Sequence, residues 1–366
     1  MRIALSTGGG DAPGLNAVIR AATLCAAHRG WEVVGIRDGF NGLMFPERYR
    51  EGSGVVHLDR LTVRGIGHLG GTVLGSTNRG NPCAIPVEQA DGSIVYEDRT
   101  DHLVELFAKA GIDALITIGG DGSLTIGQRL CEAGLRVIGV PKTIDNDLDK
   151  TTTTFGFDTA VQIATESLDR VFTTATSHSR VFVVEVMGRY AGWIALSAGF
   201  AAGAHAILIP EIPFSLEPVA AMIKRREARG AEFAVIVVAE GAIPRDGHRS
   251  VLGKAVDQAE RLGGIGEHVA QELTALTGRE ARTTVLGHLV RGGTPTAQDR
   301  LLGNRFGAAA VRAIDEGYNG VMVALNEPRV EYIPLAEATG TLRTVPTDCD
   351  TIISARDMGI SFGDDD

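Results

Sequence analysis

The chain has 366 residues, of which 44% are apolar, so it is long enough to bury two hydrophobic cores. Its formal net charge of −10 argues against a nucleic-acid-binding protein, because such proteins present a basic face to the phosphates. No segment approaches the roughly 20 apolar residues of a membrane span, and the N-terminus lacks the apolar core of a signal peptide, so we expect a cytoplasmic protein that binds neither membranes nor nucleic acid.

Short segments rich in β-branched residues recur along the chain, and each ends in glycine or a polar turn. The predicted strands span residues 3–6, 31–37, 114–119, 136–140, 181–186, 206–209, 234–239 and 283–286. Helical patterns follow the first and third of these strands, over residues 16–28 and up to about residue 133. Strands that alternate with helices indicate βαβ units and a mostly parallel sheet. The number of units predicts an α/β protein with two doubly wound, Rossmann-like domains that face one cleft.

Most glycine-rich and polar motifs directly follow a predicted strand. In open α/β sheets, ligands bind beyond the carboxyl ends of the strands. We therefore expect these motifs to line a common crevice.

The first motif, Thr7–Gly14, contains three consecutive glycines, followed by Asp11 and a Pro-Gly pair. Glycines allow several backbone N–H groups to point at one anion, and the start of the following helix adds a favourable dipole. The motif has neither the P-loop spacing nor the GxGxxG spacing. A tight strand-to-helix turn explains the same residues equally well.

The second motif, Gly119–Ser123, places an aspartate between glycines. The glycines allow a ligand to approach the backbone, and Ser123 is expected to open the next helix as its N-cap. Asp121 is a candidate Mg²⁺ ligand, because Mg²⁺ binds one or two carboxylates together with phosphate oxygens and water. The alternative is that Asp121 is a turn or capping residue.

The third motif, Thr143–Asp147, carries carboxylates at Asp145 and Asp147. In an extended segment, side chains two residues apart share a face, so both are expected to reach one reacting centre. One of them then accepts a hydroxyl proton, while the other helps to hold a metal or the substrate. A solvated acidic turn is the alternative, and composition alone favours it.

Arginines occur near the later strands: Arg189 follows the strand at 181–186, and Arg282 and Arg291 flank His288. A guanidinium group pairs bidentately with phosphate and stays charged at every relevant pH. A single arginine is more simply explained as a solvated surface residue. Three arginines at strand ends, opposite two acidic loops, favour a site for a phosphorylated ligand.

These motifs, taken in this order over about the first 330 residues, resemble the 6-phosphofructokinase family. The matching segments are 9–14, 119–123, 141–147, 187–189, Glu240 and 282–293. The resemblance implies an enzyme of glycolysis that uses Mg²⁺ to transfer the γ-phosphoryl group of ATP to the 1-hydroxyl of fructose 6-phosphate. It also implies a homotetramer or homodimer. The expected ATP domain comprises residues 1–157 and about 290–335, and the expected sugar-phosphate domain comprises 158–289 and about 336–366.

The resemblance also implies residue roles. Asp145 is similar to the family's general base, Arg189 to the residue that steadies the transferring phosphoryl group, and Asp147 and Thr143 to residues that hold the reacting groups. The implied donor contacts are Gly10, Arg79, Gly120, Asp121, Gly122, Ser123 and Lys142, with Asp121 as the Mg²⁺ ligand. The implied sugar-phosphate contacts are Thr143, Asp145, Arg180, Met187, Gly188, Arg189, Glu240, Arg282, His288 and Arg291. Arg180 and Arg282 match positions that reach the 6-phosphate from a neighbouring subunit.

Two positions give opposite indications about the donor. Lys142 stands where many ATP-using members carry glycine and pyrophosphate-using members carry lysine. Gly122 stands where the pyrophosphate users carry a second aspartate. A carboxylate at position 122 repels the α-phosphate of a nucleotide, whereas a cation at position 142 does not exclude ATP, so we expect ATP. Arg79 is displaced by one residue from its counterpart in the family.

Other functions stay open at this point. The donor is pyrophosphate in one alternative, and the acceptor is another sugar phosphate, such as sedoheptulose 7-phosphate, in a second. A third is a catalytically silent regulatory homologue, against which the presence of Asp121, Asp145 and Arg189 argues. The segment 251–265 and about the last thirty residues have no clear counterpart in the shorter members of the family.

Overall fold

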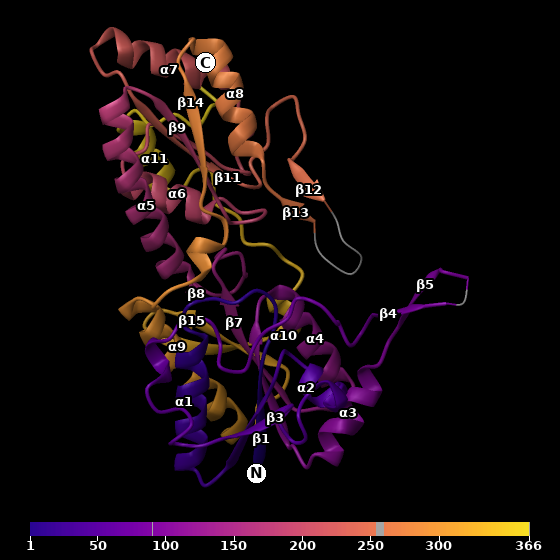
Figure 1. Ribbon diagram of the computed structural model, residues 1–366. Helices are drawn as coiled ribbons and strands as arrows, with labels where there is room; N and C mark the ends of the chain where they lie inside the picture. The colour runs from indigo at the N-terminus through magenta and orange to yellow at the C-terminus, as the bar shows by residue number, and fades with distance from the viewer. Residues whose placement is uncertain (90, 254–259, 366) are drawn as a thin grey trace. The chain divides into compact units, whose positions relative to one another are not determined.

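A computed structural model describes residues 1–89, 91–253 and 260–365 of the chain, so the segment 251–265 lies partly outside the described residues. The chain divides into two compact units (Figure 1). Unit 1 comprises Met1–Thr143, Leu148–Gly156 and Arg291–Leu342, and unit 2 comprises Ile144–Asp147, Phe157–Val290 and Arg343–Asp366. Within the described ranges, none of the helices combines the length and the apolar character that a membrane span requires.

Unit 1 is built on an eight-stranded sheet with the order β16-β15-β7-β6-β1-β2-β3, and β8 pairs with β7. Its strands are β1 (Arg2–Thr7), β2 (Glu32–Ile36), β3 (Val55–Leu58), β6 (Ala114–Gly119), β7 (Val137–Thr143), β8 (Phe155–Gly156), β15 (Val321–Asn326) and β16 (Arg329–Pro334). The central strands pair in parallel, whereas the outer pairs β2–β3 and β15–β16 are antiparallel.

Helices cover both faces of this sheet (Figure 1). They are α1 (Leu15–His28), α2 (Asn41–Met44), α3 (Thr100–Lys109), α4 (Asp121–Glu132), α9 (Ala297–Asp315) and α10 (Leu335–Ala338). Ile3 and Leu5 of β1 pack with α1 and α9, and the intervening Ala4 packs with α3 and α4 on the opposite face. Because successive strand residues point to opposite faces, an uninterrupted apolar strand is buried on both sides.

Helices α1 and α9 approach each other closely in unit 1 (Figure 1). A Cβ atom built at Gly307 of α9 would lie 2.5 Å from the backbone oxygen of Val18 and 2.9 Å from the Cβ atom of Ala21. Glycine is therefore required at this crossing, because any side chain would push the two helices apart.

Unit 2 contains a four-stranded parallel sheet with the order β10-β11-β9-β14. The strands are β9 (Val181–Val186), β10 (Ala206–Leu208), β11 (Ala234–Ala239) and β14 (Ala281–Val285), and the helices are α5 (Phe157–His178), α6 (Trp193–Ala201), α7 (Leu216–Ala228), α8 (Ile265–Thr277) and α11 (Asp350–Asp357). Helices α7 and α8 bury one face of the sheet, and α5 and α6 lie against the other.

Two short hairpins extend from these sheets. The hairpin of β4 (Ile85–Glu88) and β5 (Ile94–Glu97) belongs to unit 1, and the hairpin of β12 (Val251–Gly253) and β13 (Arg261–Leu262) belongs to unit 2. A sequence pattern of buried strands does not reveal either hairpin, because most of their residues are exposed or half-buried.

The predicted α/β class, with doubly wound and mostly parallel sheets, is confirmed, and β6, β9 and β11 have the predicted bounds. Other predicted bounds differ by one or two residues, and two larger differences lie near the polar motifs. The strand expected at 136–140 extends to Thr143, because it also pairs with β8. Helix α4 begins at Asp121 with Gly120 as its N-cap, so Ser123 lies in the first turn and does not cap the helix.

We expect Gly307→Val to destabilise unit 1, because the new side chain has no space between α9 and α1. Overpacking of this kind costs about 1–3 kcal/mol, so the melting temperature should fall. The matched control is Asn304→Val, which places the same side chain on an exposed position of α9. Equal melting temperatures for the two variants in scanning calorimetry would contradict the tight crossing.

Candidate active site

Two loops and the end of one strand of unit 1 lie at one edge of its sheet. The glycine loop, Gly8–Asp11, follows β1; the segment Gly120–Ser123 follows β6; and Lys142 lies at the end of β7. The three strands are adjacent and parallel in the order β7-β6-β1. Their carboxyl ends therefore share an edge, which is where open α/β sheets bind ligands.

These two loops are in direct contact. A Cβ atom built at Gly8 would lie 2.5 Å from Ser123 Oγ. Ser123 therefore occupies the space that a side chain at position 8 would need. Ser123 does not cap α4 as predicted; its side chain packs against the glycine loop instead.

Two cations bind carbonyl groups of the glycine loop. Lys142 is 3% exposed, and its Nζ donates to the carbonyl oxygen of Gly10. Arg291 Nη1 donates to the carbonyl oxygen of Asp11 at 3.0 Å. Since C=O and N–H point in opposite directions in a trans peptide, the N–H of Asp11 faces away from Lys142. The glycine loop is thus held in one orientation.

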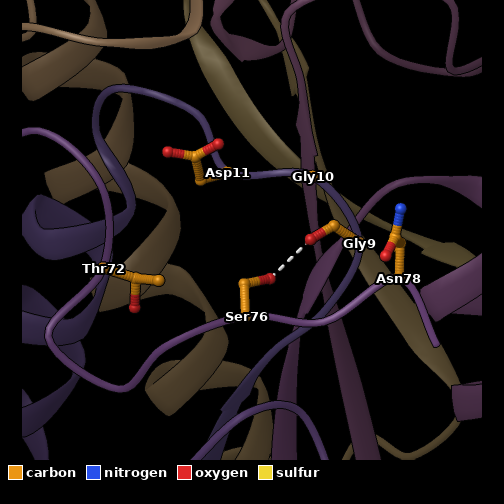
Figure 2. A pocket seen from close by; sticks show the side chains of 6 residues that line it. All are labelled: Gly9, Gly10, Asp11, Thr72, Ser76 and Asn78. Carbon is orange, nitrogen blue, oxygen red and sulfur yellow. Dashed lines mark hydrogen bonds between the residues drawn. The ribbon is translucent and has the colours of Figure 1, made fainter. Parts of the chain in front are cut away.

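The glycine loop forms one wall of an open pocket of about 410 Å³ (Figure 2). The lining residues are Gly9, Gly10, Asp11, Thr72, Ser76 and Asn78. Ser76 Oγ donates to the carbonyl oxygen of Gly9, and the N–H of Gly9 donates to the carbonyl oxygen of Thr77 at 2.9 Å. The segment 72–78 therefore completes the pocket.

Sequence reasoning missed Thr72, Ser76 and Asn78. It instead named Arg79, which is exposed and is not among the residues that line the described pocket. The small polar residues beside Gly75 were the available signal, but they do not follow a predicted strand, so their contact with the glycine loop is visible only in the fold.

The candidate metal ligand, Asp121, is exposed at the start of α4. Its Oδ1 atom accepts a hydrogen bond from the N–H of Gly340 at 2.9 Å. Neighbouring Gly122 is also exposed, and a Cβ atom built there would have no atom within 4 Å apart from its chain neighbours and the adjacent backbone of α4. Position 122 therefore has room for a larger side chain.

In unit 2, the candidate sugar-phosphate residues follow three adjacent strands. Met187, Gly188 and Arg189 follow β9, Glu240 follows β11, and His288 follows β14. The order β11-β9-β14 places these strand ends at one edge of the sheet. The N–H of Arg189 donates to Glu240 Oε1 at 3.0 Å, which joins two of the three loops.

The Asp145–Asp147 turn also belongs to unit 2. Asp145 is 4% exposed, and Asn146 is buried with φ at 53°, in the left-handed region. The expectation that Asp145 and Asp147 share a face of an extended segment is therefore wrong, because a left-handed residue between them breaks the alternation of the side chains. The solvated acidic turn is also excluded for Asp145, since its side chain is buried.

Burial raises the pKa of Glu240 to about 7. The charges of Asp145 and Glu185 act in the same direction. The backbone hydrogen bonds from Arg189 and Gly188 oppose this rise but do not cancel it. Asp145 and Glu240 are thus close enough for their charges to interact within unit 2.

Arg180 and Arg282 lie at the opposite end of this sheet. Arg180 directly precedes β9, and Arg282 pairs with Phe182 of β9. Phe182 lies five residues before Met187, which is roughly 16 Å along the strand at about 3.3 Å per residue. Both arginines form ion pairs with Glu280, at 2.9 Å for Arg180. The strand predicted at 283–286 begins two residues earlier, so Arg282, expected just before it, is the second residue of β14.

Comparison with known proteins adds to this geometry. A family model described as Phosphofructokinase matches residues 2–314. The chain is 50% identical over 364 residues to the ATP-dependent 6-phosphofructokinase of Chloroflexus aggregans, covering 100% of this chain and 98% of the relative. It is 48% identical over 352 residues to the pyrophosphate--fructose 6-phosphate 1-phosphotransferase of Amycolatopsis mediterranei, covering 95% and 97%.

A solved structure of phosphofructokinase from Saccharomyces cerevisiae is similar in fold. Its TM-score is 0.76 at 31% sequence identity. The match covers 92% of this chain and 45% of the longer yeast chain.

We expect the raised pKa of Glu240 to make unfolding pH-dependent. The native state keeps this proton up to about pH 7, whereas the unfolded state releases it near 4.5. The resulting stability is present below pH 4.5 and is lost as the pH rises through 7, a change on the order of 3 kcal/mol. When the free energy of unfolding is measured with urea between about pH 4.5 and 8, Glu240→Gln should lack the part of the decline that comes from this proton.

Glu272→Gln, at an exposed position of α8, is the matched control for this experiment. It should retain the pH dependence of the wild-type chain. If Glu240→Gln and the wild type lose stability in parallel, the assigned pKa of Glu240 is wrong.

Proposed function

The chain belongs to the phosphofructokinase family, and from that membership we propose that it transfers the γ-phosphoryl group of ATP to the 1-hydroxyl of fructose 6-phosphate, giving fructose 1,6-bisphosphate. The observation that carries the proposal is the full-length similarity to the ATP-dependent 6-phosphofructokinase of Chloroflexus aggregans. The presence of buried Asp145 in a turn near Glu240 supports a catalytic chain over a silent homologue.

Unit 1 carries the residues assigned to the donor. The glycine loop precedes α1, whose N-terminal dipole favours an anion. Lys142 and Arg291 hold two successive carbonyl groups of this loop, which fixes the direction of the intervening N–H. A preorganised loop of this kind binds phosphate oxygens without a reorganisation cost at the moment of reaction.

Unit 2 carries the residues assigned to the sugar phosphate, apart from Thr143 and Arg291, which belong to unit 1. Asp145 takes the proton from the sugar 1-hydroxyl, which makes that oxygen a better nucleophile. Arg189 stabilises the transferring phosphoryl group, and Thr143 and Asp147 help to hold the reacting groups. Glu240 accepts or donates a hydrogen bond to the sugar according to pH, because burial brings its pKa to about 7.

The residues present fit a Mg²⁺ ion that arrives with the donor. Mg²⁺ needs only one or two carboxylates when phosphate oxygens and water supply the other ligands. Asp121 is exposed beside Gly120, and no group of three or more potential ligand side chains occurs in the parts of the chain that the structure describes. Asp121 would therefore hold the ion, which when bound neutralises charge on the phosphates.

ATP is proposed as the donor in preference to pyrophosphate. Lys142 is the feature that favours pyrophosphate, and a relative with that activity in its name is 48% identical. However, Lys142 already binds the carbonyl of Gly10, so its presence is explained by the glycine loop. Gly122 leaves open the space that an aspartate would fill, which supports a nucleotide.

We also propose a cytoplasmic homo-oligomer, as a homodimer or homotetramer. Arg180 and Arg282 lie at the amino end of the unit 2 sheet, whereas Met187 and Glu240 lie at its carboxyl end. The two arginines are therefore suited to bind the 6-phosphate of a sugar held by a neighbouring subunit, and not of one held by their own subunit.

Replacement of the proposed base, Asp145→Asn, should lower kcat by about 10²–10⁴-fold, the usual effect of removing a general base. The KM for fructose 6-phosphate should change much less, because the amide keeps the size of the side chain. A coupled assay at saturating ATP measures both. Asp348→Asn, at an exposed position, should behave as the wild type, and a near-normal kcat in Asp145→Asn would reject the assignment.

The wild-type chain should turn over ATP faster than pyrophosphate, and Gly122→Asp should lower kcat/KM for ATP by roughly 10- to 100-fold, through repulsion at short range. The loss for pyrophosphate should be much smaller. Gly122→Asn has nearly the same size without the charge and serves as the control. If the wild type prefers pyrophosphate, Lys142 and not Gly122 determines the donor.

A further inference from the structure

The Asp145–Asp147 turn is bound by a residue almost 200 positions later in the chain. The N–H of Arg343 donates to the carbonyl oxygen of Asp147 at 2.9 Å. The guanidinium Nη1 of the same residue lies 3.4 Å from the carbonyl oxygen of Asn146, to which it donates. Arg343 and the turn both belong to unit 2. One residue therefore holds two successive carbonyl groups of the turn.

Arg343 is itself fixed by Trp193, the first residue of α6. The guanidinium carbon lies 4.5 Å from the centroid of the indole ring, which is a cation–π contact. The indole Nε1 donates to the carbonyl oxygen of Arg343 at 3.1 Å. The tryptophan thus restrains both the side chain and the backbone of Arg343.

The neighbouring backbone is anchored in the same region. The carboxylate of Glu211 accepts a hydrogen bond from the N–H of Gly192 at 3.0 Å and another from the N–H of Val345 at 2.9 Å. Glu211 therefore ties the start of α6 to the segment that carries Arg343. Trp193 directly follows Gly192, and Arg343 lies two residues before Val345.

We infer that Arg343 is a positioning residue that acts on the reaction through Asp145, with Trp193 holding it in place. The inference rests on the proposed role of Asp145 as the base. Asn146 has a left-handed conformation, which residues other than glycine adopt at a cost unless their surroundings fix it. The two bonds from Arg343 act on the carbonyl groups that follow Asp145, and so they fix the turn from which its carboxylate projects.

The expected consequence is a loss of rate without a comparable loss of nucleotide binding. A displacement of about 1 Å in a reacting group reduces rates by up to about 10²-fold. Arg343→Ala should therefore lower kcat by about 10- to 100-fold and leave the KM for ATP within about twofold of the wild-type value. Arg343→Lys, which keeps a donor but loses the planar stack, should be intermediate.

The decisive measurement is a double-mutant cycle on kcat with Asp145→Asn. If Arg343 acts through Asp145, adding Arg343→Ala to Asp145→Asn should lower kcat no further. A general loss of structure would instead lower kcat by the same factor in both backgrounds, and that result would overturn the inference.

Arg356→Ala is the matched control, because Arg356 also lies in the C-terminal segment and stacks over an aromatic ring, that of Phe362, at 5.0 Å. It should keep wild-type kcat. If Arg343→Ala fails to fold, as judged by loss of its thermal transition, the cycle is run with Arg343→Lys and with Trp193→Phe, which removes the indole N–H.

Failure of this inference differs from failure of the proposed function. A normal kcat in Asp145→Asn alone would reject Asp145 as the base, and with it the role of Arg343. A strongly impaired Asp145→Asn together with a normal kcat in Arg343→Ala would reject only the positioning role.

Discussion

In a parallel sheet every strand ends at the same edge, and the chain must cross back through a helix before the next strand begins. Both units of this protein depend on that constraint. It brings the ends of β7, β6 and β1 together in unit 1, and those of β11, β9 and β14 in unit 2. Residues far apart in sequence therefore reach one edge of their sheet, and the loops there are supported by a buried sheet on one side.

Cations in this protein are used repeatedly to hold the backbone of these loops. Lys142 and Arg291 bind carbonyl groups of the glycine loop, and Arg343 binds carbonyl groups of the Asp145–Asp147 turn. A carbonyl partner fixes the path of the main chain directly, because the peptide plane turns with it. Loops that bear functional groups are thereby restrained without added helices or strands.

The buried carboxylates of unit 2 lower the stability of the folded state. Glu240 lies close enough to Asp145 and Glu185 for their charges to raise its pKa further, after burial has already raised it. Like charges held together in a poorly solvated place oppose folding, since the unfolded chain separates them. The apolar core of β9, β11, α7 and α8 in the same unit offsets this cost, as is usual when a site is arranged for function and not for stability.

The sequence by itself determined the α/β class, the bounds of β6, β9 and β11, and the family, because these depend on local patterns of apolar residues and on short motifs. It did not determine the left-handed turn at Asn146, the place of Arg282 at the start of β14, or the lining of the pocket by Thr72, Ser76 and Asn78. These features depend on contacts between segments that are distant in sequence. Arg343 is the clearest case: nothing in its neighbours distinguishes it, and only the folded chain places it against Trp193 and the turn, because a cation finds its carbonyl partners through the packing of the whole unit.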